Sequence, residues 1–66
     1  MNYNRKVKND NGKHVEVYSV EQFASAFTKS RLMSIVENRV NRLYDQYDSV
    51  KVEGSLFDDK YIITCI

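Results

Sequence analysis

Residues 6–18 read KVKNDNGKHVEVY, and this stretch decides how the chain begins to fold. Val7 on one side of the NDNG segment and Val15 and Val17 on the other alternate with polar residues. Such alternation has the period of two that is typical of half-buried strands. The segment between them, residues 9–12, is rich in the residues that form tight turns. We therefore predict an antiparallel hairpin in this part of the chain.

Two registers fit this hairpin. A two-residue loop at residues 11–12 pairs Val7 with Glu16, which places an apolar and a charged side chain on the same face. A three-residue loop, a type I turn with Gly12 in the left-handed conformation, pairs Val7 with Val15 instead. Glycine favours that conformation, and the apolar faces then match. We predict the register with the three-residue loop.

The middle of the chain predicts a helix. Residues 19–22, SVEQ, fit a capping box that begins at Ser19. Neither glycine nor proline interrupts residues 20–47, so about 27 residues can be helical. The apolar residues form two stripes, rotated by about half a turn from each other. The first stripe contains Val20, Phe23, Ala24 and Phe27, and the second contains Leu32, Val36, Val40, Leu43 and Tyr47.

Two geometries explain the change of stripe, which falls at residues 28–30. Either the helix bends or breaks near Lys29, or one long helix packs its first half on its own sheet and its second half on something else. A straight helix of about 27 residues is about 40 Å long, twice the span of a six-residue strand. In both geometries apolar surface remains that the protein's own sheet does not cover.

The C-terminal part of the chain predicts a second hairpin. Val50 and Val52 alternate with charged residues, and residues 54–59 turn the chain. Residues 61–66, YIITCI, are apolar on both faces, which is typical of a central strand with both sheet faces covered. One helical layer covers only one face. We therefore expect a second copy of the chain to cover the other.

These elements predict one small α+β domain over residues 1–66, in the order β-β-α-β-β. Its antiparallel sheet carries one long or bent helix packed on one face. A chain of 66 residues buries only about 60% of the surface that its unfolded form exposes. Because its own core is then marginal, we expect a homodimer or a higher homo-oligomer.

Composition favours a cytoplasmic protein without a membrane partner. The longest apolar run is three residues, far below the roughly 20 needed to cross a membrane. The first ten residues lack the apolar core of a signal peptide. Phe, Tyr, Asn, Lys and Ile number 24, against eight for Gly, Ala, Arg and Pro together. That excess is expected of an AT-rich gene and favours a phage or another mobile element as the source.

The sequence holds no enzymatic constellation. His14 and Cys65, the only histidine and the only thiol, form a dyad only if the two hairpins adjoin and both residues point the same way. The sequence has neither a His/Cys cluster for zinc nor a phosphate-binding glycine loop nor a GxSxG motif. We expect no catalytic residues, no cofactor and no metal.

The leading functional hypothesis is a small non-enzymatic regulator or inhibitor that binds another host or cellular protein. It rests on surplus apolar surface combined with the lack of a catalytic site. A net charge of +1 is not typical of a nucleic-acid binder, which is strongly basic. The predicted protein interface, with the two arginines at its rim, is Leu32, Val36, Arg39, Val40, Arg42, Leu43, Tyr44 and Tyr47.

The alternative hypothesis is a DNA-binding regulator. Residues 19–38, SVEQFASAFTKSRLMSIVEN, resemble a helix-turn-helix. The resemblance is loose, because Thr28 and Lys29 stand where the motif has a glycine and an apolar residue. If residues 19–42 hold this motif, nucleic acid is the partner. The side chains that face phosphates or base edges are then Arg31, Asn38, Arg39 and Arg42.

Overall fold

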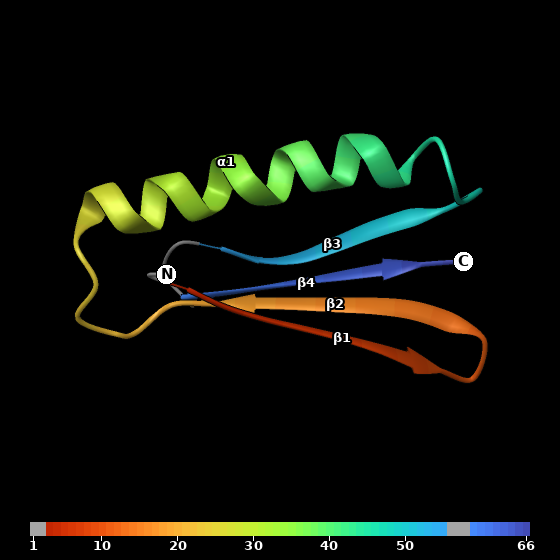
Figure 1. Ribbon diagram of the computed structural model, residues 1–66, viewed down its shortest axis with the longest axis horizontal. Helices are drawn as coiled ribbons and strands as arrows, with labels where there is room; N and C mark the ends of the chain where they lie inside the picture. The colour runs from red at the N-terminus through yellow and green to blue at the C-terminus, as the bar shows by residue number, and fades with distance from the viewer. Residues whose placement is uncertain (1–2, 56–58) are drawn as a thin grey trace.

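The protein is described here by a computed structural model, which covers residues 3–55 and 59–66 and contains a four-stranded antiparallel sheet with one helix (Figure 1). The elements are β1 (Asn4–Asp10), β2 (Lys13–Ser19), α1 (Ala26–Leu43), β3 (Val50–Ser55) and β4 (Lys60–Cys65). The strands lie side by side in the order β1-β2-β4-β3. The predicted α+β fold with the order β-β-α-β-β is confirmed.

The turn between β1 and β2 has two residues, so the predicted three-residue loop is wrong. Asn11 and Gly12 both have positive φ angles, 52° and 82°, as a type I′ turn requires. Val7 therefore pairs with Glu16 rather than with Val15. The prediction assumed that a charged side chain would not share a face with valine. In the fold the Glu16 side chain is buried, and its carboxylate is hydrogen-bonded to neighbouring side chains. This charged residue therefore lies on the buried side of β2.

The helix is one element of 18 residues, shorter than predicted. Its N-cap is Ser25, whose hydroxyl accepts a hydrogen bond of 3.1 Å from the backbone N–H of Thr28. Ser19 is instead the last residue of β2, so the capping box predicted there is wrong. The prediction failed because the same pattern, a serine followed three residues later by a glutamine, can occur at the end of a strand as well as at the start of a helix. No bend or break occurs near Lys29, which lies inside α1.

The two apolar stripes have separate explanations. In the first, Val20 reaches the core from the segment that precedes α1, whereas Phe23 and Phe27 are 92% and 75% exposed. In the second, Leu32 and Val36 pack on the protein's own sheet. The stripes change because a non-helical segment ends and α1 begins, so the sheet covers the second stripe without a partner.

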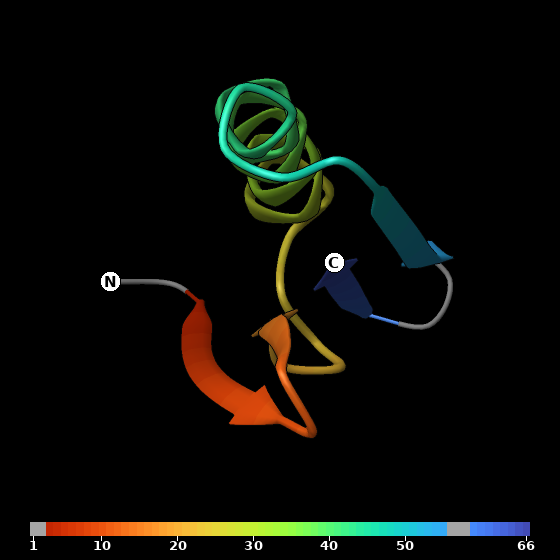
Figure 2. The same cartoon turned by 90° about the vertical axis from the view of Figure 1, so that its right-hand side faces the viewer.

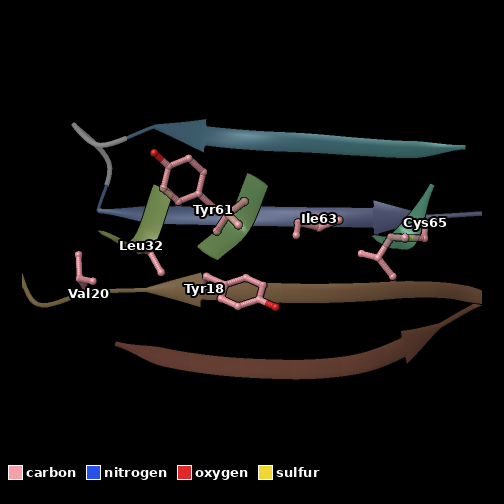
Figure 3. Close-up of a cluster of buried hydrophobic side chains, with 8 residues drawn as sticks. Tyr18, Val20, Leu32, Tyr61, Ile63 and Cys65 are labelled. Atoms are coloured by element: carbon pink, nitrogen blue, oxygen red, sulfur yellow. The ribbon is translucent and has the colours of Figure 1, made fainter. Parts of the chain in front are cut away.

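The core lies between α1 and one face of the sheet (Figure 2). α1 contacts β3 and β4, while β1 is exposed along its whole length. The buried apolar residues that form this core cluster, several of which Figure 3 labels, are Tyr18, Val20, Leu32, Val36, Leu43, Tyr61, Ile63 and Cys65. Because the helix is displaced toward β3, the β1 side of the same sheet face stays uncovered. Within the described residues, the helix α1 is not long and apolar enough to cross a membrane.

Candidate functional site

Glu16 is the one charged side chain that is completely buried among residues 3–54 and 59–66, with 0% exposure. It lies in the middle of β2. Successive side chains of a strand alternate between its faces, so Glu16 shares the helix-facing side with His14 and Tyr18. A buried carboxylate is costly unless it is paired and hydrogen-bonded. The side chains around it therefore define a site.

Four side chains hold this carboxylate. Arg39 of α1 contacts it through Nε, 3.1 Å from Oε1 and 3.0 Å from Oε2, and through Nη2, 2.9 Å from Oε2. The Tyr18 hydroxyl donates to Oε1 at 2.7 Å, and His14 Nε2 lies 2.7 Å from Oε2. Arg5 of β1 donates to Oε1 at 3.3 Å. The network thus ties β1, β2 and α1 together through one residue.

The network keeps Glu16 ionised. Burial by itself raises the pKa of this carboxyl, but hydrogen bonds from Arg39, Tyr18 and His14 outweigh it and lower the pKa to about 2. Burial, and then the hydrogen bond to Glu16, raise the pKa of Tyr18, so its phenol keeps the proton that it donates. At neutral pH the cluster holds one negative charge between two guanidinium groups.

A cleft of about 380 Å³ opens next to this network, between α1 and β1, whose separation Figure 2 shows. The lining residues come from β1, β2, α1 and the segment before β1, and they include three arginines and no carboxylate. They are Tyr3, Arg5, Tyr18, Ile35, Asn38, Arg39 and Arg42. The cleft is therefore a cationic surface with an aromatic wall.

Aromatic rings and Arg5 make up the β1 side of the cleft. The rings of Tyr3 and Tyr18 lie 6.2 Å apart at an angle of 33°. The guanidinium carbon of Arg5 lies 5.9 Å from the centre of the Tyr18 ring, and Arg5 Nε donates to the Tyr18 hydroxyl at 3.0 Å. These contacts fix the direction of Arg5, although its side chain is 45% exposed.

Hydrogen-bond donors remain available in the cleft. A guanidinium has five N–H donors on three nitrogens. Arg5 and Arg39 each use Nε and Nη2 in the contacts above, which leaves Nη1 without a partner among the described residues. Arg42 is exposed and, within residues 3–55 and 59–66, forms no ion pair. The three arginines therefore outweigh the single charge of Glu16.

The structure separates the residues of the predicted protein interface. Leu32, Val36 and Leu43 are 1%, 3% and 0% exposed, so they have no surface to offer a partner. Val40 and Tyr47 are partly buried against the core. The exposed members are Arg42 and Tyr44, and Arg39 faces the cleft. The second apolar stripe cannot form both the core and a protein interface, because α1 has only one apolar side and that side packs on the protein's own sheet.

The helix-turn-helix predicted for residues 19–42 is wrong. Residues 20–25 are not helical, and a single helix follows. Of the four residues proposed to face nucleic acid, Asn38, Arg39 and Arg42 line the cleft, whereas Arg31 is exposed outside it. The resemblance arose from the spacing of the apolar residues on either side of the start of α1.

The predicted condition for a His14–Cys65 dyad is met, since the two residues are cross-strand partners on the helix-facing side. His14 is nevertheless engaged, because Nε2 contacts Glu16 and the ring stacks on Tyr47 with centroids 5.5 Å apart. Cys65 is 0% exposed, and burial raises the pKa of its thiol. A nucleophilic cysteine reacts as the thiolate, which this surrounding disfavours.

Sequence reasoning missed Tyr3, Arg5, Glu16 and Tyr18 as site residues. The available signal was Arg39, which has no acid three or four positions away on its helix. An arginine without a partner on its own helix can pair with a carboxylate of another element. Glu16 is a candidate, because strand alternation places it on the same side as Tyr18.

Comparison with known proteins adds no family to this description. No family model, no curated protein and no solved structure matches the chain.

Proposed function

We propose that this protein is a small non-enzymatic regulator or inhibitor that acts by binding another protein. Its contact site is the cationic cleft, and its target is an acidic segment of the partner. The observation that carries the proposal is the convergence of Arg5, Arg39 and Arg42 on one cleft whose lining includes no carboxylate. The buried Glu16 balances only part of that charge.

The cleft suits carboxylate ligands because its donors are held in place before binding. Glu16 fixes the guanidinium of Arg39 and contacts that of Arg5, so their remaining N–H groups point in set directions. Planar guanidinium groups bind carboxylates through two parallel hydrogen bonds, which gives geometric selectivity as well as affinity. Ordering the site in advance lowers the entropy cost of association. Asn38 adds an amide that can donate or accept.

Binding rather than catalysis is favoured by how the reactive groups are used. Glu16 accepts hydrogen bonds at both oxygens and has a pKa of about 2, so it is a poor proton acceptor at neutral pH. His14 is occupied by Glu16, and the Cys65 thiol resists ionisation. The carboxylate and the imidazole of the cluster thus serve to position other side chains.

A protein partner is favoured over nucleic acid by the placement of the cations. Arg5 points to the helix-facing side of β1, whereas its neighbours Lys6 and Lys8 occupy the opposite side, as strand alternation requires. A protein that binds a nucleic-acid duplex presents its basic residues together on one surface. Cations on both sides of one strand match instead a segment that lies alongside it.

Fluorescence anisotropy with a short fluorescein-labelled Glu-rich peptide tests the proposal. The Arg42→Gln variant removes a cleft cation, and Arg31→Gln is the matched control on the same helix outside the cleft. We expect Arg42→Gln to weaken binding about tenfold and Arg31→Gln less than twofold, the former close to the lower limit for hydrogen bonds to charged groups. Equal effects of the two variants, or tighter binding of a labelled DNA duplex, contradict the proposal.

Self-association stays a prediction of the sequence. The sheet face opposite α1 carries Val17 and Ile62, which are cross-strand partners and half-buried. If a second copy covers this face, Ile62→Glu should shift the protein to monomers in sedimentation equilibrium while far-UV circular dichroism stays the same. A monomeric mass for the unmodified chain in dilute solution would contradict the predicted homo-oligomer.

A further inference from the structure

The free edge of β1 adjoins the cationic cleft. β1 is the terminal strand in the order β1-β2-β4-β3, and all seven of its residues are exposed. A terminal strand presents a row of backbone N–H and C=O groups that no neighbouring strand satisfies. Such an edge can receive an extended segment of another chain as an added strand.

The type I′ turn settles which residues of β1 bond to β2. The turn's own hydrogen bond joins its first and fourth residues, so Asp10 and Lys13 form a hydrogen-bonded pair. Hydrogen-bonded and non-hydrogen-bonded pairs alternate along an antiparallel ladder. Lys8 and Lys6, at alternate positions, therefore also direct their backbone groups toward β2.

The outward-directed backbone groups belong to Arg5, Val7 and Asn9. These residues occupy the non-hydrogen-bonded positions of the ladder. Their side chains lie on the helix-facing side, and Arg5 is a lining residue of the cleft. A strand that pairs with them places the side chains opposite Arg5 and Val7 on that same side. Backbone pairing and cleft binding are thus geometrically compatible.

We propose that the acidic segment binds as a fifth strand along the free edge of β1, with alternate side chains entering the cationic cleft. This inference rests on the proposed function and specifies how the partner is held. The residue opposite Arg5 is acidic, and the residue opposite Val7, which is 47% exposed, is apolar. The residues opposite Lys6 and Lys8 are acidic and lie on the other face. Opposite charges on directly facing positions stabilise a strand pair.

Charge repulsion disfavours β1 of a second copy as the strand that pairs with this edge. Two antiparallel β1 strands would bring Arg5, Lys6 and Lys8 of one copy next to those of the other, and facing like charges are destabilising. The other terminal strand, β3, carries Lys51 and Glu53, which already pair with each other at 3.1 Å. Neither edge of this sheet complements the cations of β1, so the occupant is an acidic segment of a different protein.

Backbone methylation of the ligand distinguishes strand addition from simple charge binding. A labelled peptide with the order acidic, apolar, acidic, acidic, which faces Lys8, Val7, Lys6 and Arg5 in an antiparallel pair, is compared with the same peptide N-methylated at the amides that would face β1. Both peptides carry identical charge. We expect the methylated peptide to bind at least tenfold more weakly. We also expect hydrogen exchange at the amides of Arg5, Val7 and Asn9 to slow only with the unmethylated peptide.

A variant of the protein gives the reciprocal test. Val7→Pro removes an outward N–H and blocks pairing, and proline is tolerated on an edge strand whose N–H faces solvent. We expect at least tenfold weaker peptide binding with an unchanged far-UV spectrum. If Val7→Pro fails to fold, the two peptides still decide the matter.

The outcomes separate this inference from the proposed function. Equal affinity of the two peptides, with unchanged exchange at the β1 amides, overturns strand addition. If Arg42→Gln still weakens binding in that case, the cleft proposal stands. If neither peptide binds, both proposals fail. Protection of the β1 amides without peptide, together with a doubled mass, shows that a second copy occupies the edge and also overturns the inference.

Discussion

Arg39 of α1 holds the carboxylate of Glu16 on β2 through two nitrogens, 3.0 and 2.9 Å from Oε2, although 23 positions separate the two residues in sequence. The pair joins the helix to β2, although α1 lies closer to β3 and β4. It therefore sets the position of α1 relative to β1, and with it the width of the cleft.

Replacing Glu16 by glutamine should destabilise the fold. The change keeps the shape of the side chain but removes the charge that pairs with Arg39 and Arg5. Since both arginines reach solvent, we expect a loss of about 2–3 kcal/mol in the free energy of unfolding. Urea denaturation followed by circular dichroism measures it. Glu53→Gln, at an exposed position, is the control and should change little. Similar losses in the two variants would contradict the role assigned to the buried carboxylate.

Stability should fall in acid because of Glu16. Its pKa in the fold is about 2, below the ordinary value of 4.5 that applies when the chain unfolds. The unfolded state therefore binds the proton first, and the contribution of Glu16, present in full above about pH 4.5, is lost as the pH falls toward 2. The difference corresponds to about 3 kcal/mol. Urea titrations at a series of pH values measure it, and Glu16→Gln should flatten the profile. An equally steep profile in that variant would assign the acid sensitivity to other groups.

Truncating Leu43 should destabilise the chain without any partner present. Leu43 is 0% exposed in the core between α1 and the sheet, so Leu43→Ala should cost about 2–5 kcal/mol in the free energy of unfolding. Tyr44, its neighbour, is 58% exposed, and Tyr44→Ala should change stability by less than about 0.5 kcal/mol. Thermal melting at several protein concentrations measures both. A cost for Leu43→Ala that grows with protein concentration would mean that this side chain lies at an interface after all.

The two glycines should differ in their tolerance of alanine. Gly12 has a φ of 82°, but a Cβ there meets nothing within 4 Å, so Gly12→Ala should cost about 1 kcal/mol. Gly54 has a φ of 111°, and a Cβ there would clash with the backbone carbonyl of Lys60 on β4. We expect Gly54→Ala to cost about 2 kcal/mol or more, because backbone must move. Chemical denaturation compares the two, and an equal cost would refute the steric argument at Gly54.

Much of the fold was predictable because strand and helix periods are local properties. The strands of both hairpins could be located from the alternation around Val15 and Val17, the turn residues at 9–12 and the apolar strand at 61–66. The predicted second turn at residues 54–59 is wrong at residues 54–55, which belong to β3, and residues 56–58 lie outside the described residues. The start of α1 was not predictable in this way. Both Ser19 and Ser25 are suitable N-cap residues by sequence, and only the pairing of Ser19 with Lys60 in the sheet decides between them.

The site was less predictable, because its defining residue breaks the expected pattern. Glutamate between two valines indicates a solvent-facing position, and that assumption selected the wrong hairpin register. Burial of Glu16 depends on Arg39 and Arg5, which come from other elements. Such a contact between distant segments is not encoded in the spacing of either one. Arg39 and Arg42 were identified as functional candidates, but as the rim of an apolar interface or, in the alternative hypothesis, as contacts to nucleic acid.

The two-residue turn at Asn11 and Gly12 has an evolutionary consequence. Because side chains alternate along a strand, a loop that also took in Asp10 would slide β1 by one position against β2 and turn it over. Lysines 6 and 8 would then face the helix, and Arg5 would leave Glu16. A substitution at the hairpin tip that favours a three-residue loop would thus exchange the chemistry of the two sides of β1 while β2, β3 and β4 keep their register.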